Sequence, residues 1–203
     1  MSHAARRGLL IFLAGLVVLL GALVVEYLYL NAPGAGLADI SAPVGATIGG
    51  PFTLTDQNGA PRRPEDFRGK LMLIYFGYTY CPDVCPTELQ TMSDAIDRLG
   101  AQGDAVQPIF ITVDPGRDTP EQLKSYAENF HPSLVALTGS AEQIAQAARA
   151  YKVFYQPVKQ GDGEYLMDHS SIVYLMDRDG HYLAHFGGNI SAEQMAAAIA
   201  KHL

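Results

Sequence analysis

Leu71-Met-Leu-Ile-Tyr-Phe76 is followed, after a short loop, by Cys81-Pro-Asp-Val-Cys85-Pro86. The first segment is a continuous apolar run of strand length, which is typical of a central strand covered on both faces. Residues 86–99 then carry apolar side chains at helical spacing, and Gly100 is suited to end a helix. The two cysteines therefore lie between a buried strand and a helix, where open α/β sheets place their functional groups.

The alternation of strands and helices continues on both sides of this segment. Residues 52–59 predict a short hairpin, and residues 107–113 predict a second buried strand. Three helix starts carry an N-cap residue followed three positions later by glutamine. They are Thr119-Pro-Glu-Gln122, Ser140-Ala-Glu-Gln143 and Ser191-Ala-Glu-Gln194.

The C-terminal part predicts a second hairpin, with strands at 172–176 and 182–186 joined by the turn Asp177-Arg-Asp-Gly180, before the last helix. The whole order predicts an α/β three-layer sandwich, a central mixed sheet flanked by helices. The final antiparallel hairpin followed by a helix favours a thioredoxin-like arrangement over a doubly wound one. We expect this domain to occupy residues 51–203.

The N-terminal segment has a different composition. Residues 8–25 carry no charge, and about 20 apolar residues suit a transmembrane helix. Arg6 and Arg7 precede them, which by the positive-inside rule places the short N-terminus in the cytoplasm. A cleaved signal peptide is the alternative, but its apolar core usually runs about 7–15 residues. We expect a cytoplasmic N-terminus and anchor over residues 1–30 and an Ala/Gly/Pro-rich linker over residues 31–50.

Charge and targeting limit the partners and the compartment. The chain has 14 Lys and Arg against 21 Asp and Glu, a formal net charge of −7, and no basic patch, so nucleic acid is not an expected partner. An anchor or a signal peptide exports the rest of the chain. Because the N-terminus lacks a long Arg- and Ser-rich presequence, we expect a bacterial inner membrane, with the domain in the periplasm.

Cys81 and Cys85 are the only cysteines of the chain. Pro86 suits the first helical turn, so we expect Cys85 near the N-cap, where the helix dipole favours a thiolate. With three residues between them, both sulfurs can converge on one centre, for metal binding or for disulfide exchange. A purely structural disulfide is the alternative, but so short a loop would restrict the unfolded chain little.

Two thiolates select soft metals, and outside the cytoplasm Cu(I) is the foremost of these. A neutral imidazole would complete a three-coordinate site that also accepts Cu(II). Among six histidines, His169 is the best candidate, because it lies at the entry to a strand beside Asp168, which could orient its ring. The histidines that remain open as alternatives are His131, His181 and His185.

Three segments occur in order along the chain: Tyr75-Phe-Gly-Tyr-Thr-Tyr-Cys-Pro-Asp-Val-Cys-Pro-Thr-Glu-Leu89, Val113-Asp-Pro-Gly-Arg-Asp-Thr-Pro-Glu121 and Asp168-His-Ser-Ser171. Together they resemble the SCO/SenC family of cytochrome c oxidase assembly proteins, over about residues 50–203. The resemblance implies that Cys81, Cys85 and His169 are the copper ligands. Asp114, Arg117 and Asp118 of the second segment fit loop hydrogen bonding and partner docking equally well.

The resemblance implies a copper metallochaperone, which delivers copper to the dinuclear copper centre of cytochrome c oxidase. Its main partner is then the copper-bearing oxidase subunit, with a periplasmic copper donor and a thiol reductant as further candidates.

Two enzymatic readings stand beside this one. A thiol–disulfide reductase would reduce the copper-ligand cysteines of the oxidase subunit with Cys81 and Cys85 as its redox pair, and it does not need His169. Dedicated thioredoxin-like reductases usually carry two residues between their cysteines rather than three. A peroxidase of the peroxiredoxin type fits less well, because residues 74–81 do not follow the pattern Pro-x-x-x-Thr-x-x-Cys.

Overall fold

The computed structural model describes residues 20–21 and 48–203. The expected anchor and almost all of the expected linker lie outside the described residues, so both stay predictions. In the described part of the chain, no helix is both long enough and apolar enough to cross a membrane.

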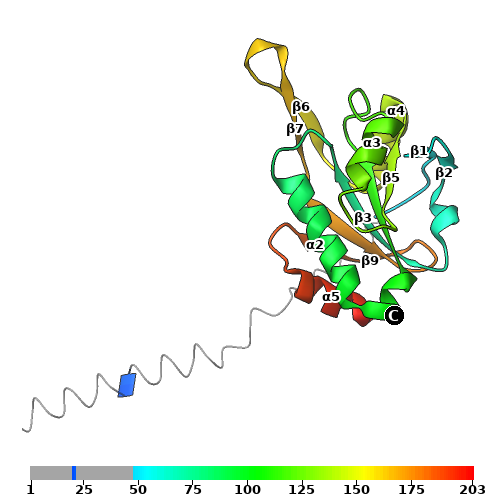
Figure 1. Cartoon of the computed structure of the whole chain (residues 1–203), viewed down its shortest axis with the longest axis vertical. Coiled ribbons are helices and arrows are strands. Elements are labelled where there is room, and N and C mark those ends of the chain that lie inside the picture. Colours follow the sequence, from blue (N-terminus) through cyan, green and yellow to red (C-terminus); the bar gives the residue numbers. More distant parts are fainter. Residues whose placement is uncertain (1–19, 22–47) are drawn as a thin grey trace, which may run out of the picture. The chain divides into compact units, whose positions relative to one another are not determined.

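The core is a mixed seven-stranded sheet in the order β2-β1-β5-β4-β3-β8-β9. Strands β3, β4 and β5 run parallel to one another, and the outer pairs are antiparallel. Figure 1 shows these strands between the helices. The strands are β1 (Leu54–Asp56), β2 (Pro61–Arg62), β3 (Leu71–Gly77), β4 (Val106–Thr112), β5 (Val135–Thr138), β8 (Ile172–Met176) and β9 (Tyr182–Gly187).

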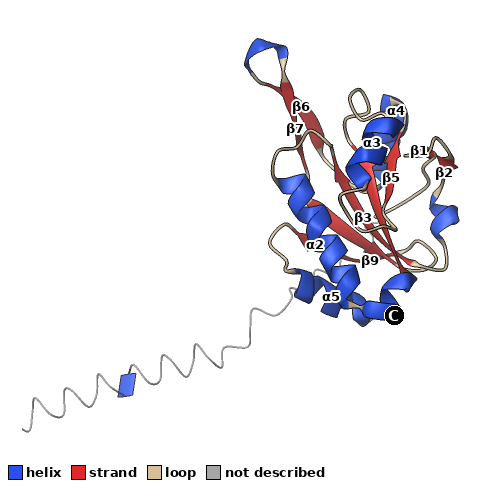
Figure 2. Cartoon of the chain, in the orientation of Figure 1, coloured by secondary structure: helices blue, strands red, loops and turns tan. Residues whose placement is uncertain are grey.

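Helices cover both faces of this sheet, as Figure 2 shows. They are α2 (Val84–Arg98), α3 (Pro120–Ala127), α4 (Ala141–Ala150) and α5 (Ala192–Ala200), with 3₁₀ turns at Pro64–Phe67, Gly100–Ala105 and Gly161–Gly163. Helices α2 and α5 pack side by side.

Neighbouring side chains of β3 identify the two layers. Every residue of β3 is buried, and successive side chains point to opposite faces of a sheet. Tyr75 contacts Cys85 of α2 and packs against Phe110, whereas Phe76 packs against Tyr151, the residue that ends α4. The predicted three-layer, thioredoxin-like arrangement is confirmed.

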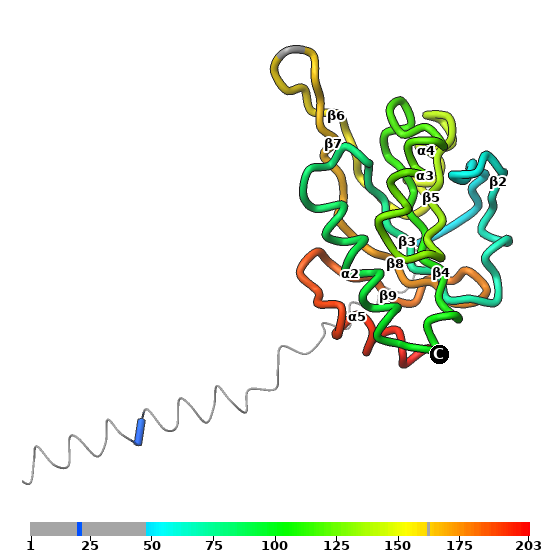
Figure 3. The backbone as a smooth tube through the Cα atoms, viewed as in Figure 1, coloured from blue at the N-terminus to red at the C-terminus, as the bar shows by residue number. Residues whose placement is uncertain are grey.

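A second sheet was not predicted. It is the two-stranded hairpin of β6 (Tyr155–Lys159) and β7 (Tyr165–His169), which forms no ladder with any other described strand. Figure 3 shows it projecting away from the central sheet. His169 therefore ends a hairpin strand of its own, and two residues separate it from the start of β8.

The helix starts agree with the capping signals except at one position. Ser140 and Ser191 form reciprocal capping boxes. Thr119 accepts a hydrogen bond from the Gln122 backbone, but the Gln122 side chain donates to Thr79 at 3.2 Å instead of returning to the cap. The predicted capping box of α3 is therefore half formed.

Helix α2 begins at Val84, two residues earlier than predicted. Pro86 is accommodated because the first helical turn has no intrahelical acceptors for its N–H groups, so a missing N–H costs nothing there. Cys85 thus lies within the helix.

Substitution of Gly77, at the end of β3, tests the close packing of β3 against Cys85 and Phe110. A Cβ at this position would lie 2.9 Å from Cys85 Sγ and 2.9 Å from the Phe110 ring. We expect Gly77→Ala to lower the free energy of unfolding by about 1–3 kcal/mol through overpacking, measured by urea denaturation. Gly187→Ala is the matched control, since its Cβ would meet nothing within 4 Å, and should change stability by less than about 0.5 kcal/mol. Equal effects of the two substitutions would contradict the packing described here.

Candidate metal centre

Cys85 lies in the first turn of α2, and its side chain is fully buried. The Tyr75 hydroxyl lies 3.7 Å from its sulfur and 3.3 Å from the Ser171 hydroxyl. Gly77 leaves the space that this sulfur fills. The thiol is therefore packed against β3 through Tyr75 and Gly77.

Cys81 lies in the loop between β3 and α2 and is only partly buried. Its sulfur accepts a hydrogen bond from the Cys85 backbone N–H at 3.5 Å. Its own N–H donates to the Tyr78 carbonyl at 3.3 Å, which closes the loop. Cys81 is thus the outer of the two thiols.

His169 reaches the same place from the end of β7. Its Nε2 atom lies 3.3 Å from Cys85 Sγ, and its Nδ1 atom lies 3.2 Å from the Ser170 carbonyl oxygen. The Tyr78 ring meets the imidazole edge-on, with centroids 5.8 Å apart and planes at 90°. The structure thus brings Cys81, Cys85 and His169 together.

The two thiols differ in acidity. A hydrogen bond from the Cys85 side chain, aided by His169 and by the backbone N–H groups of Asp83 and Cys85, lowers the pKa of Cys81 to about 3. The hydrogen bond to the Cys81 sulfur and burial raise the pKa of Cys85 far above its ordinary value. The expectation of a thiolate at Cys85 is wrong, because burial and the hydrogen bond to the Cys81 sulfur raise its pKa, and the lowered pKa is that of Cys81.

The orienting role predicted for Asp168 has no hydrogen bond to support it in the described residues. Asp168 is exposed and, as the neighbour of His169 on a strand, it points to the opposite face. The carbonyl of Ser170 lies at Nδ1 instead. The sequence could not predict this contact, because every residue has a backbone carbonyl and none is marked as the partner of the imidazole.

The three histidines that the sequence left open as alternatives lie elsewhere. His131 contacts the Ser133 hydroxyl, His181 contacts Asp177 in the β8–β9 turn, and His185 contacts the Tyr182 hydroxyl. None of them reaches the thiols.

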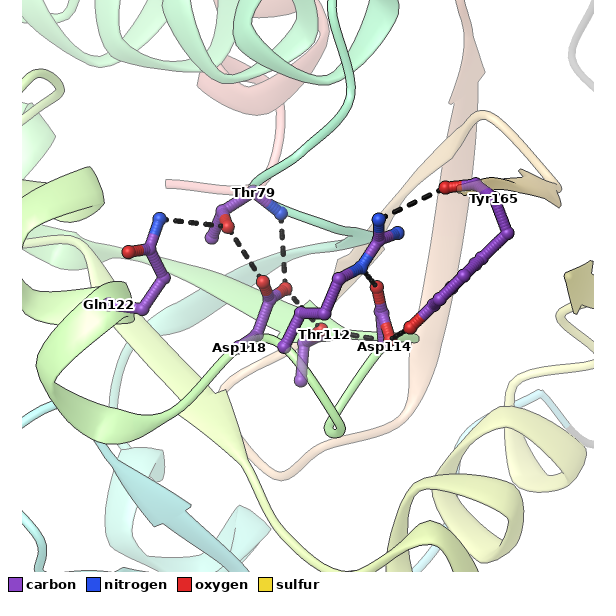
Figure 4. A network of polar contacts seen from close by, with 7 residues as sticks. Thr79, Thr112, Asp114, Asp118, Gln122 and Tyr165 are labelled. Carbon is purple, nitrogen blue, oxygen red and sulfur yellow. Dashed lines mark hydrogen bonds and ion pairs between the residues drawn. The ribbon is translucent and has the colours of Figure 1, made fainter. Parts of the chain in front are cut away.

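Loop residues that the sequence left undecided hold the cysteine loop. The Asp118 carboxylate, fully buried, accepts hydrogen bonds from the Thr79 backbone N–H at 3.1 Å and from the Thr79 hydroxyl at 2.7 Å. It also accepts one from the Thr112 hydroxyl at 2.5 Å. Figure 4 shows these contacts. Asp118 therefore ties the start of the cysteine loop to the end of β4.

An open groove of about 320 Å³ is lined by Cys81 and His169. Cys81 and Val84 lie on one side of it, and the cross-strand pair Val158 and Leu166 of the hairpin lies on the other. Cys81 is therefore accessible from outside through a largely apolar groove.

Two sulfurs and one imidazole nitrogen form a donor set for a soft metal. Thiolates and imidazole together suit copper in both oxidation states, and the lowered pKa of Cys81 favours its thiolate form. The same pair of thiols, one exposed and acidic and one buried, also suits disulfide exchange.

The difference between the thiols can be measured by alkylation. We expect iodoacetamide to modify Cys81 first, at a rate nearly constant between pH 5 and pH 7.5, because this range lies above its pKa of about 3. An ordinary thiol, with a pKa of about 8.5, would react about tenfold faster per pH unit over the same range. Peptide mass spectrometry distinguishes the two sites. Preferential labelling of Cys85, or a tenfold slope for Cys81, would contradict the assignment.

Comparison with known proteins agrees with this geometry. The SCO1/SenC family model matches residues 41–203. The mitochondrial SCO2 homolog of Mus musculus is 45% identical over 162 residues, covering 78% of this chain but only 64% of that protein. The copper-bound structure of ScoI from Bradyrhizobium japonicum has a TM-score of 0.72 and 46% identity, covering 77% of this chain and 99% of that one.

A more distant structure shares the fold as well. BsSco, a member of the Sco family of cytochrome c oxidase assembly proteins in which a disulfide switch was identified, has a TM-score of 0.61 and 30% identity. It covers 77% of this chain and 93% of its own. The motifs, the fold and these matches lead to one conclusion: the chain belongs to the SCO1/SenC family.

Proposed function

We propose that this protein is a copper metallochaperone, which binds Cu(I) or Cu(II) through Cys81, Cys85 and His169 and delivers it to the dinuclear copper centre of cytochrome c oxidase. One observation carries the proposal: the Cys85 sulfur and His169 Nε2 lie 3.3 Å apart although 84 positions separate them in sequence. Such convergence of soft donors, in a relative of a protein with copper bound, is what a cargo site for copper requires.

The residues around the site prepare these donors for the metal. Cys81 supplies a thiolate without first losing a proton at neutral pH, and Cys85 releases its proton when a metal binds. His169 needs a free lone pair on Nε2, so its proton must lie on Nδ1. The Ser170 carbonyl at 3.2 Å is placed to accept that proton's hydrogen bond and so to select this tautomer.

The proposed setting follows from the sequence. The domain of residues 51–203 lies in the periplasm, residues 1–30 anchor it in a bacterial inner membrane, and residues 31–50 link the two. The recipient is the copper-bearing subunit of the oxidase, and a second periplasmic copper chaperone and a thiol reductant complete the cycle.

A second candidate function is thiol–disulfide reduction of the recipient subunit, favoured by the contrast between Cys81 and Cys85. The Cys81 thiolate attacks a disulfide of the partner, forming a mixed disulfide and releasing one partner thiolate. Cys85 then loses its proton and attacks the Cys81 sulfur, which releases the second partner thiolate and leaves a Cys81–Cys85 disulfide. An external dithiol must then restore the pair.

Copper binding is tested by the visible spectrum of the reduced domain with one equivalent of Cu(II). We expect strong thiolate-to-copper charge-transfer bands in the wild type, and their loss or marked shift in His169→Ala, because the third donor is removed. His185→Ala is the matched control and should retain the wild-type spectrum, since its ring contacts Tyr182. If the His169 variant keeps both the bands and the affinity, histidine ligation at this position is wrong.

Reduction is tested by trapping. The Cys85→Ser variant should accumulate a mixed disulfide between Cys81 and an oxidised copper-binding domain of the oxidase, because the resolving thiol is absent. His169→Ala should reduce the same domain at about the wild-type rate. Non-reducing electrophoresis and mass spectrometry report both results. If no mixed disulfide is trapped while copper transfer is intact, the reductase function is wrong and only the carrier function remains.

A further inference from the structure

The imidazole and the thiols of the candidate site belong to two segments that share no backbone ladder. His169 ends β7, and the β6–β7 hairpin pairs only with itself among the described strands. The thiols lie on the loop and helix that follow β3. Two residues join His169 to β8, which pairs with β3, and side-chain contacts add to this link in setting the distance between the hairpin and the cysteine loop.

Arg117 makes such contacts with the hairpin. Its Nη1 atom donates a hydrogen bond to the Tyr165 carbonyl oxygen at 3.0 Å, at the start of β7. Its guanidinium carbon lies 3.8 Å from the centroid of the Tyr165 ring, which is a close cation–π contact.

The same guanidinium also faces the cysteine loop. Its carbon lies 4.8 Å from the Tyr80 ring centroid and 5.8 Å from that of Tyr78. The buried Nη2 atom has no hydrogen-bond partner, in keeping with a guanidinium enclosed by aromatic rings. Arg117 thus lies between the segment that carries Cys81 and the strand that carries His169.

Asp114 holds Arg117 in this place. Its carboxylate pairs with Arg117 Nε and accepts a hydrogen bond from the Tyr165 hydroxyl at 2.8 Å. The Asp114 backbone N–H in turn donates to the Thr112 hydroxyl, the group that also bonds Asp118. One loop between β4 and α3 therefore braces the cysteine loop through Asp118 and the hairpin through Asp114 and Arg117.

We propose that Arg117 is a positioning residue of the metal site, which holds β7 so that His169 stays over the two thiols. This inference rests on the proposed copper-binding function. Arg117 ligates nothing itself and acts only through the imidazole. The loss of Arg117 should therefore weaken the binding of Cu(II), which needs the third donor. It should leave the binding of Cu(I) nearly unchanged, because two thiolates can hold Cu(I). Lysine cannot replace it, because lysine lacks the planar fork that stacks and bonds at once.

The test is a double-mutant cycle between Arg117 and His169 in the reduced protein. We expect Arg117→Ala to raise the dissociation constant for Cu(II) about 10- to 100-fold, the range typical of residues that orient a metal ligand. Competition with a Cu(I) chelator should show less than about a threefold change. Arg117→Ala should add almost nothing in the His169→Ala background, because the ligand through which it acts is gone. Additive losses, or equal losses for both oxidation states, would overturn the proposal.

Arg62→Ala is the matched control. Arg62 also pairs through Nε with a buried aspartate, Asp56 at 2.8 Å, but it lies on β2 in the other hairpin. It should leave both copper affinities unchanged. If Arg117→Ala does not fold, Arg117→Lys keeps the charge and should show the same selective loss of Cu(II).

A metal-free measurement separates this inference from the proposed function. Hydrogen exchange of the apo protein should quicken in β6 and β7 of Arg117→Ala while β3 and β4 keep their protection. If the wild type binds no copper, the proposed function fails. Faster exchange confined to the hairpin would still support the positioning role of Arg117. Unchanged exchange in β6 and β7 would refute the positioning role of Arg117 even if copper binds normally.

Discussion

The buried carboxylate of Asp118 is the constraint on which the arrangement of the site depends. Its side chain is fully buried, and burial is the main reason that its pKa is raised. A polar group so placed must find partners within the protein, since leaving it unpaired costs about 1–3 kcal/mol. Its partners Thr79 and Thr112 lie just beyond β3 and at the end of β4. Satisfying this one group therefore fixes the direction in which the cysteine loop leaves the sheet.

The parts of the fold with strong local signals were predictable from the sequence. The apolar run over residues 71–76 is β3, and the serines before α4 and α5 cap their helices as predicted. Such signals are readable because a buried strand and a helix start each depend on a few adjacent residues. The choice of His169 rested on its neighbours and on family resemblance, and the structure brings its ring to Cys85.

The β6–β7 hairpin could not be predicted, for a physical reason. Most of its β6 residues are exposed and Pro157 lies in the strand, so it lacks the apolar alternation of a strand that covers a core. Its position depends on Arg117 and Tyr165, which are 48 positions apart. A contact between distant positions also explains why the Gln122 side chain was predicted wrongly, since it bonds Thr79 rather than its own helix cap. Contacts between distant segments override the local preference in both cases.

Which of the two cysteines has the lowered pKa also could not be predicted from the sequence alone. The helix start favours an anion in general, but only the structure shows that Cys85 is buried against β3 and that its N–H donates to the Cys81 sulfur. Burial penalises charge on the inner sulfur, and the outer sulfur collects the available donors.

The separation of the hairpin from the seven-stranded sheet has a kinetic consequence for the proposed copper carrier. An imidazole attached to the main sheet could withdraw only if backbone hydrogen bonds of the core were broken, which would link unloading to unfolding. Here the imidazole belongs to a two-stranded arm that contacts the cysteine loop through side chains, including the Arg117 guanidinium and its aromatic neighbours. Local opening of such an arm needs much less free energy than global unfolding. A stable domain can thereby hold its cargo and still release it quickly.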